Sequence, residues 1–189
     1  TLSRDLTLAL RQRGDVWART AWVAEFGREY SANLLALARA KSPSAGVADI
    51  IWQSADFSTI AQRQCQLEQD AARHGSPVLI CDTDALATCI WHERYLGQPS
   101  VDVEHIAASM PPRALYLLTS DEGVPFEDDG LRDGEHLRAW MTGRFQARLA
   151  QQAVPWLELK GSRESRCQNA LAAVDAMMAN AWRFAIPLG

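Results

Sequence analysis

The stretch Pro77–Thr88, PVLICDTDALAT, decides how this chain folds. Val78–Cys81 is an apolar run of the kind that forms a strand buried on both faces of a sheet. The run ends at Asp82 and Asp84 and leads into Ala85–Trp91, a stretch that favours a helix. Because open α/β sheets bind ligands outside the carboxyl ends of their strands, this pattern predicts chemistry at the aspartate pair.

The two aspartates have two interpretations. In a kinase or a nucleotide hydrolase, a carboxylate at this point binds Mg²⁺, directly or through water, or accepts the proton of the attacking hydroxyl. Alternatively, Asp82 or Asp84 only caps the N-terminus of the following helix. The two interpretations stay open at this point, and the rest of the chain has to separate them.

Composition sets the outer limits. The chain has 189 residues, of which 48% are apolar and 22% are charged, and this is ordinary for one globular domain with a proper core. A formal net charge of −4 argues against nucleic-acid binding as the main function. No run approaches the ~20 apolar residues of a membrane span. The four cysteines form no C-x-x-C pair, so the sequence disfavours a zinc site and suggests reduced thiols in a cytoplasmic protein.

Strands and helices alternate along the chain. Apolar runs predict strands near residues 21–24, 78–81, 114–118 and 156–159. Helical stretches are expected at about 2–13, 29–40, 56–74, 83–96, 103–110, 135–152 and 163–181. We therefore predict an α/β fold over residues 1–189, with one parallel sheet covered by helices on both faces in three layers. A helix before the first strand is unusual, since a right-handed βαβ unit would need a strand ahead of Thr1.

Charged residues gather after other strands as well. Glu25 and Arg28 follow the first predicted strand. The stretch from about 122 to 145 begins with many acids and no apolar periodicity, which predicts a mobile loop acting as a lid. Arginine forks such as those of Arg132 and Arg138 suit phosphoryl oxygens, although a solvated charged loop is the alternative. Asp56 is either a further site residue or the N-cap of the next helix.

Five short motifs occur in a fixed order over nearly the whole chain. They are Glu25-Phe26-Gly27-Arg28-Glu29-Tyr30, Asp56-Phe57-x-x-Ile60-Ala61-x-x-Gln64, Asp82-Thr83-Asp84-x-x-x-Thr88, Asp128-Asp129-Gly130-Leu131-Arg132-Asp133 and Gly161-Ser162-Arg163-Glu164-x-Arg166. Each is weak alone, but together they resemble the ribosylnicotinamide kinase domain of the bacterial NAD-biosynthesis regulator family, in the P-loop nucleoside-kinase group.

The resemblance implies a nucleotide-binding segment that precedes Thr1. In this family a strand and a phosphate loop, G-x-x-x-x-G-K-[ST], come directly before two residues that Thr1 and Leu2 match. We therefore expect the first strand and the phosphate loop upstream of this sequence, with the Thr1 hydroxyl near the α-phosphate of ATP.

The resemblance also implies roles for the charged residues. Glu25 and Arg28 would line the nucleoside pocket, and Asp56 would bind the sugar or the ring. Asp82 would act at Mg²⁺ or as the base for the 5′-hydroxyl, with Asp84 assisting.

Further roles fall on the lid and on the last helix. Arg132 and Arg138 would reach the phosphates from the lid. Ser162 and Arg163 would border the adenine.

The implied reaction transfers a phosphoryl group from ATP to nicotinamide riboside and gives nicotinamide mononucleotide. A carboxylate-rich pocket suits the positive pyridinium ring of that substrate. The alternatives are a kinase for another nucleoside, a regulatory module that senses ATP or NAD without turnover, and an inactive remnant. Members of the family are often fused to an adenylyltransferase domain, but this chain has neither its H-x-G-H motif nor a basic recognition helix.

Overall fold

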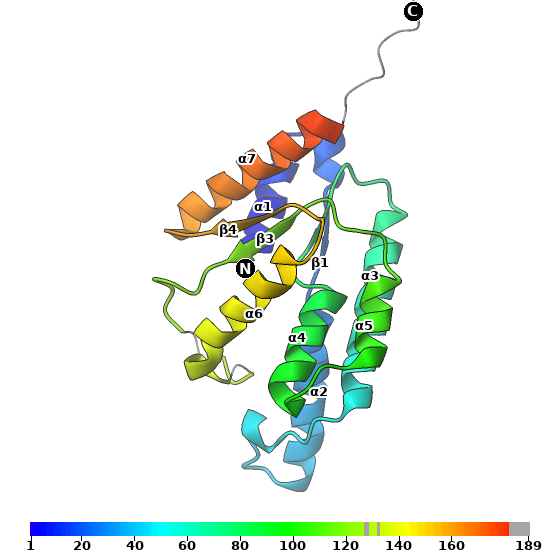
Figure 1. The fold of residues 1–189 in the computed structure, drawn as a ribbon, viewed down its shortest axis with the longest axis vertical. Coiled ribbons are helices and arrows are strands. Elements are labelled where there is room, and N and C mark those ends of the chain that lie inside the picture. Colours follow the sequence, from blue (N-terminus) through cyan, green and yellow to red (C-terminus); the bar gives the residue numbers. More distant parts are fainter. Residues whose placement is uncertain (127–128, 132, 182–189) are drawn as a thin grey trace, which may run out of the picture.

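A computed structural model describes residues 1–126, 129–131 and 133–181 of the chain (Figure 1). Its strands are β1 (Ala21–Val23), β2 (Leu79–Cys81), β3 (Tyr116–Thr119) and β4 (Trp156–Leu159). Its α-helices are α1 (Leu2–Arg11), α2 (Phe26–Lys41), α3 (Ser54–Ala72), α4 (Ala85–Leu96), α5 (Val101–Ala108), α6 (Arg138–Ala150) and α7 (Arg163–Ala181). Short 3₁₀ turns lie at Asp15–Arg19, Val47–Asp49 and Glu135–Leu137. The alternation of helices and strands confirms the predicted α/β class.

The strands pair in parallel, but in two separate sheets. β1 pairs with β2, so that Ala21 lies opposite Leu79, and β3 pairs with β4, so that Tyr116 lies opposite Trp156. The prediction of one continuous three-layer sheet is not confirmed by the described strands, because β2 and β3 do not hydrogen-bond to each other. The edge of each of these two strands faces a cleft instead.

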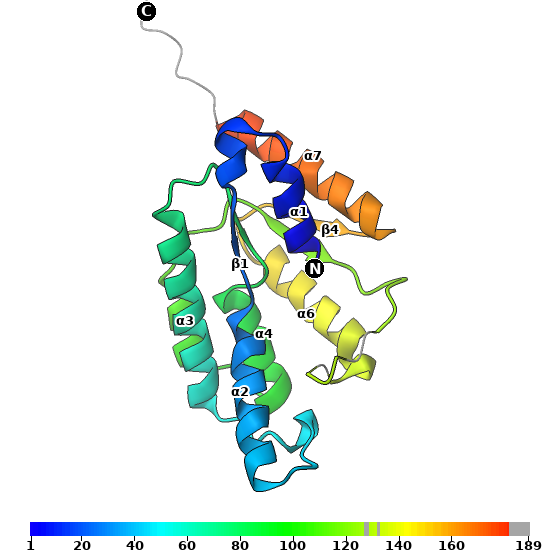
Figure 2. The ribbon, with the colours of Figure 1, turned by 180° about the vertical axis from the view of Figure 1, so that it is seen from behind.

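Two apolar cores correspond to the two ends of the molecule. The first joins α3, α4 and α5 through Phe57, Ala61, Cys65, Ala85, Cys89 and Val103. The second joins α1 and α7 to β4 through Leu6, Leu10, Leu159, Ala170 and Val174. Both views show α1 and α7 together at one end, with α2 to α5 toward the other (Figures 1 and 2). The strands lie between these helix groups.

Helix boundaries follow local capping chemistry. The side chain of Asp84 accepts a hydrogen bond from the backbone N–H of Ala87 at 3.1 Å and so starts α4. Gly97, with φ of +73°, ends the same helix in the left-handed conformation that glycine adopts without strain. α2 begins at Phe26, earlier than predicted, and therefore carries Arg28 in its first turn rather than in a loop.

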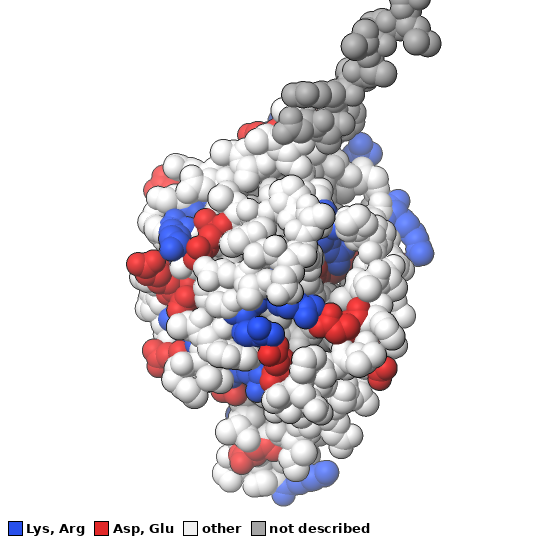
Figure 3. All heavy atoms as spheres, viewed as in Figure 1, with Lys and Arg blue, Asp and Glu red and all other residues white. Residues whose placement is uncertain are grey.

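Charges of both signs are mixed over the surface. The face in Figure 3 shows acidic and basic side chains side by side, without a continuous basic patch. Many are paired, as in Arg13 with Asp175 and Arg148 with Glu104, each with a nitrogen 2.6 Å from a carboxylate oxygen. Within the described ranges, no helix is both long and apolar enough to cross a lipid bilayer.

We predict that Phe57→Ala lowers the free energy of unfolding by about 3–5 kcal/mol, because the ring is 1% exposed and its removal leaves a cavity in the first core. Urea unfolding followed by circular dichroism measures this change. The control Leu37→Ala, at a residue that is 63% exposed, should stay within ~0.5 kcal/mol of wild type. Equal losses in the two variants would contradict the assignment of Phe57 to the core.

Candidate functional site

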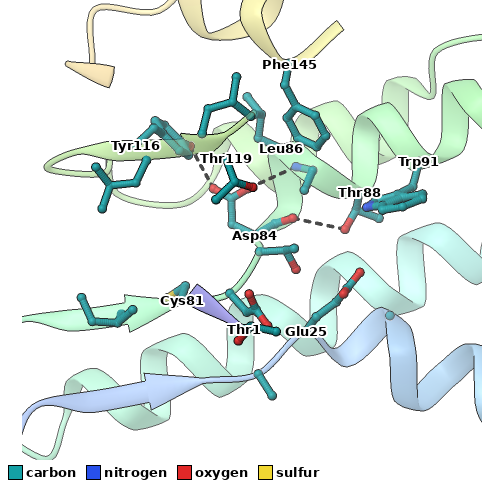
Figure 4. Close-up of a pocket in the computed structure, with 18 of the residues that line it drawn as sticks. Thr1, Glu25, Cys81, Asp84, Leu86, Thr88, Trp91, Tyr116, Thr119 and Phe145 are labelled. Carbon is teal, nitrogen blue, oxygen red and sulfur yellow. Dashed lines mark hydrogen bonds between the residues drawn. The ribbon is translucent and has the colours of Figure 1, made fainter. Parts of the chain in front are cut away.

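A cleft of about 1520 Å³ opens between the two sheets, and all of β2 and β3 lines it. The carboxyl ends of these strands therefore meet one cavity, as the sequence pattern predicts. Most of the predicted site residues line the cleft, namely Thr1, Glu25, Arg28, Asp82, Asp84 and Arg138. Figure 4 shows Thr1, Glu25 and Asp84 around it, although they come from different elements.

Asp82 is the open carboxylate of the site. Its backbone N–H donates to the Val23 carbonyl at 2.9 Å and so continues the pairing of β1 with β2. The side chain lines the cleft, and none of the described residues hydrogen-bonds to it or forms an ion pair with it. A strand end thus presents a half-buried carboxylate that can hold a ligand or accept a proton.

Asp84 differs from Asp82, because both of its carboxylate oxygens accept hydrogen bonds from other residues of the chain. It is 7% exposed, and one of its oxygens caps α4 through Ala87. The other oxygen accepts a hydrogen bond from the Tyr116 hydroxyl at 2.8 Å (Figure 4). The same oxygen accepts from Nε of Arg113 at 3.1 Å. The helix-cap interpretation therefore applies to Asp84, whose carboxylate caps α4, and the interpretation as a metal ligand or proton acceptor stays a prediction for Asp82.

A buried polar cluster continues behind Asp84. Nη2 of Arg113 lies 2.6 Å from Oε2 of Glu68, an ion pair whose angle is not that of a hydrogen bond. The Gln64 side-chain amide donates to Glu68 at 3.2 Å and to the Thr83 carbonyl at 3.1 Å. Its oxygen accepts from the Phe26 N–H at 3.0 Å. The cluster thus links α2, α3 and the end of β2.

Burial controls the titration of this cluster. Desolvation raises the pKa of Glu68, and the nearby charge of Arg113 opposes that shift. Desolvation disfavours the charged form of Arg113, but the carboxylates of Asp84 and Glu68 outweigh it and raise its pKa. Burial, followed by the charge of Asp84, raises the pKa of Tyr116, so its hydroxyl stays a donor. Arg113 is therefore a permanent cation between two carboxylates.

Sequence reasoning missed Glu68 and Arg113. A signal for Glu68 was present, because it shares one helical face with the buried residues Phe57, Ala61 and Gln64, at spacings of four and three. A charged residue on such a face needs a buried partner. The partner itself, Arg113, follows two prolines, and nothing local marks it.

Aromatic rings form another wall of the cleft. Trp52 lies 5.0 Å from Tyr95 between ring centroids, and Trp91 stacks on Tyr95 at 6.3 Å. The guanidinium of Arg94 lies over Tyr95 and Trp91, at 4.6 and 5.2 Å from their centroids. The indole N–H groups of Trp52 and Trp91 are buried, and the described residues supply neither with an acceptor. The wall therefore offers flat aromatic surfaces to the cleft.

The segment between β3 and α6 (residues 120–137) is tied to the cleft by charged contacts. Arg94 donates to the Asp133 carboxylate at 2.7 Å, and the Tyr95 hydroxyl donates to the same oxygen at 2.9 Å. Arg28 donates to Asp129 at 2.7 Å. Gly134 has φ of +75°, and a Cβ there would collide with the Arg94 guanidinium. Arg94 is thus the main anchor of this segment.

We predicted that Arg28 and Arg138 would contact the ligand. In the structure, both contact groups of the protein instead. Arg28 pairs with Asp129, as described above. Arg138 donates to the backbone carbonyls of Val124 at 2.7 Å and Asp121 at 3.1 Å, and so holds the start of its own segment. The third predicted arginine, Arg132, lies outside the described residues, as does Asp128 of the same motif.

Asp56, Ser162 and Arg163 do not line the cleft. One Asp56 oxygen accepts from the Gln53 N–H at 2.7 Å at the start of α3, and the other accepts from the Tyr30 hydroxyl at 2.7 Å. Burial and this second bond raise the pKa of Tyr30 to about 12. Asp56 is therefore not the N-cap itself, which is Gln53, but lies three residues into the capping box and accepts from the N-cap backbone.

The loop before α7 joins that helix to α1. Arg163 pairs with Asp5 at 2.6 and 2.7 Å, and the Ser162 hydroxyl accepts from the Ser165 N–H at 3.1 Å. Arg166, 6% exposed, lines the cleft and donates to the carbonyls of Ser120 and Gly161 at 2.6 and 2.8 Å. Arg166 therefore holds together the loops that follow β3 and β4.

The carboxylates of the cleft suit a metal ion whose ligands come mainly from phosphate groups and water. Within the described part of the chain, no three His, Cys, Asp or Glu side chains cluster as metal ligands. Mg²⁺ in nucleotide sites needs only one or two carboxylates, because phosphates and water complete its shell. Asp82 fits that requirement.

Comparison with known proteins places most of the chain in one family model. Residues 1–166 match a family model described as an AAA domain. No curated protein matches the chain.

We predict that Gly134→Ala loosens the segment between β3 and α6, because alanine is strained at positive φ and its Cβ would collide with Arg94. A penalty of ~1–2 kcal/mol would raise the rate of proteolytic cleavage within this segment about 5–30-fold. Limited proteolysis with mass spectrometry measures it. Gly143→Ala, in α6 with open space around it, is the control and should be cleaved as wild type. Unchanged cleavage of Gly134→Ala would show that Arg94 does not anchor the segment.

Proposed function

The chain belongs to the AAA-domain family, a nucleotide-binding group of the P-loop type, and we propose that it transfers a phosphoryl group from ATP to nicotinamide riboside. The observation that carries this proposal is the open carboxylate of Asp82, which stands in the cleft at the carboxyl end of β2. Phosphoryl transfer needs little covalent chemistry from the protein, which acts by positioning and by neutralising charge. A carboxylate that is fixed by a strand and free of protein partners suits that task.

The separated sheets support a fifth strand between them. Among the described strands, β2 pairs in parallel with β1 alone and β3 with β4 alone, and apolar side chains such as Ile80 and Leu117 line the space between β2 and β3. A strand in this position would hydrogen-bond to both and join the two sheets into one. We place here the strand and the phosphate loop that are expected before Thr1. The loop would then lead into the N-terminus of α1, which favours phosphate.

Either Mg²⁺ or the attacking hydroxyl would meet Asp82. When bound, Mg²⁺ neutralises the charge that develops on the transferring group. Asp82 would hold this ion, directly or through water, or accept the proton of the 5′-hydroxyl at one of its oxygens. Thr1 lines the same cleft, where its hydroxyl would contact a phosphate.

The aromatic wall supports a substrate with a flat, positively charged ring. Trp91 and Tyr95 offer ring faces to which a pyridinium is attracted. The wall also contains the indole N–H groups of Trp52 and Trp91, which are buried and have no acceptor among the described residues; a shift of either ring toward the cleft would let its N–H donate to an acceptor such as a carboxamide oxygen. Glu25 lines the same cleft and contributes negative charge. Nicotinamide riboside carries both the cationic ring and the carboxamide.

A sensor of ATP or NAD without turnover is the second candidate. It is favoured by Arg28 and Arg138, whose guanidiniums contact Asp129 and backbone carbonyls rather than the open cleft. In either case a fused or separate adenylyltransferase domain is the expected partner, since it would convert a mononucleotide into a dinucleotide.

We predict that the protein with its natural upstream residues phosphorylates nicotinamide riboside faster than uridine, cytidine or thymidine in the presence of ATP. Asp82→Asn should lower kcat about 10²–10⁴-fold, because it removes the proton acceptor and the metal ligand, while the protein stays folded. Coupled ADP release measures turnover. Asp70→Asn, at an exposed position that pairs only with Arg73 among the described contacts, is the control. Tight ATP binding with no product from any nucleoside would favour the sensor.

Trp91→Leu tests the aromatic wall. Loss of a stacking face worth ~1–2 kcal/mol should raise KM for nicotinamide riboside about 5–30-fold and leave KM for ATP unchanged. Steady-state kinetics with each substrate varied separately shows the difference. An equal rise in both KM values would contradict a role of Trp91 in binding the nucleoside ring.

A further inference from the structure

Three consecutive residues at the end of β2 are each held by a different element. The Asp82 N–H donates to Val23 in β1 at 2.9 Å. The Thr83 carbonyl accepts from Gln64 in α3 at 3.1 Å. Asp84 accepts from Arg113, which precedes β3, at 3.1 Å. The backbone on both sides of the open carboxylate is therefore fixed from three directions.

Arg113 is the centre of this arrangement. Its Nε and Nη2 contact Asp84 and Glu68, and the Asp84 and Glu68 side chains are only 10% and 1% exposed. Glu68 in turn accepts from Gln64 at 3.2 Å, and Gln64 also holds the Thr83 carbonyl. One guanidinium thus fixes Asp84 directly and Thr83 through two intermediate side chains.

Arg113 also balances the buried charge of this cluster. Two buried carboxylates share the one guanidinium. Without Arg113, both carboxylates would be buried next to each other with no cation among their described partners. The end of β2 would then have to move, or one carboxylate would have to take up a proton.

Stability alone is a weak reason for such a cluster. Buried ion pairs can often be replaced by apolar side chains of similar volume with no loss of stability. By contrast, removal of residues that hydrogen-bond to a ligand-binding side chain and orient it commonly lowers metal affinity or activity about 10–100-fold. The place of the cluster, directly behind the strand end, favours the second role.

We infer that Arg113, acting with Glu68 and Gln64, is a positioning residue that fixes the backbone at 82–84 so that the Asp82 carboxylate faces the transferring phosphoryl group. This inference rests on the proposed function, since that function assigns Asp82 its role. Arg113 itself touches no reacting atom in this scheme. Its effect passes through Asp84 and the Thr83 carbonyl.

The test compares two apolar double replacements in the protein with its natural upstream residues. Arg113→Met with Glu68→Met removes the cluster, and Arg148→Met with Glu104→Met removes a control ion pair that joins α5 to α6 at 2.6 Å. For the first pair we expect kcat to fall about 10–100-fold, with both KM values close to wild type, in protein that is still folded without urea. The control should keep its kcat. The single variant Arg113→Lys should lose less kcat than the double variant, because the lysine ammonium keeps the positive charge but not the forked geometry of the guanidinium.

Two results would overturn the inference. One is an unchanged kcat in the Arg113 and Glu68 double variant. The other is a fall in kcat that is fully explained by a smaller fraction of folded protein, as urea unfolding would show. The role of Arg113 would then be structural.

A separate readout distinguishes this inference from the proposed function. Calorimetry measures how much Mg²⁺ strengthens ADP binding, and it requires no turnover. If wild type forms no product from any nucleoside, the proposed function fails. The inference still stands if the double variant weakens the Mg²⁺ effect about 10–100-fold, and it falls if that effect is unchanged.

Discussion

Arg113 lies between two buried carboxylates, with Nε 3.1 Å from Asp84 and Nη2 2.6 Å from Glu68. Glu68 belongs to α3, which packs on β1 and β2, whereas Arg113 leads into β3 of the other sheet. The ion pairs therefore connect the two sheets across the cleft that separates β2 from β3. A buried charge without its partner is costly, so the distance between the sheets and the position of the strand end are fixed together.

This constraint explains why two aspartates only two positions apart behave differently. The carboxylate of Asp84 accepts hydrogen bonds from the N-terminus of α4 and from Arg113, whereas the carboxylate of Asp82 faces the cleft. Opposite them, Arg94 and its aromatic neighbours hold the segment between β3 and α6 through Asp133. The lining of the cleft thus combines the carboxylates at the strand ends with the aromatic rings beside Arg94. A substrate that combines a hydroxyl to be phosphorylated with a flat cationic ring would suit both parts of this lining.

Local patterns predicted the parts of this fold that depend on local chemistry. The apolar runs gave all four strands to within two residues, because a buried strand needs such a run wherever it pairs. Pairing itself depends on distant neighbours, so the separation of β2 from β3 could not be predicted. Glu68 was marked by its place on an apolar helical face, but its partner Arg113 was not, since the ion pair joins residues 45 positions apart (113 against 68). The contacts of Arg28 and Arg138 within the protein likewise depend on tertiary structure.

The most direct test of the account is a crystal structure of the protein with its natural upstream residues, bound to Mg²⁺, a non-hydrolysable ATP analogue and nicotinamide riboside. We predict that a strand fills the space between β2 and β3, and that the 5′-hydroxyl lies within hydrogen-bonding distance of the Asp82 carboxylate. The pyridinium ring should lie against Trp91 or Tyr95. A nucleoside bound elsewhere, or an Asp82 side chain turned out of the cleft, would contradict the assignment of this cleft as a phosphoryl-transfer site.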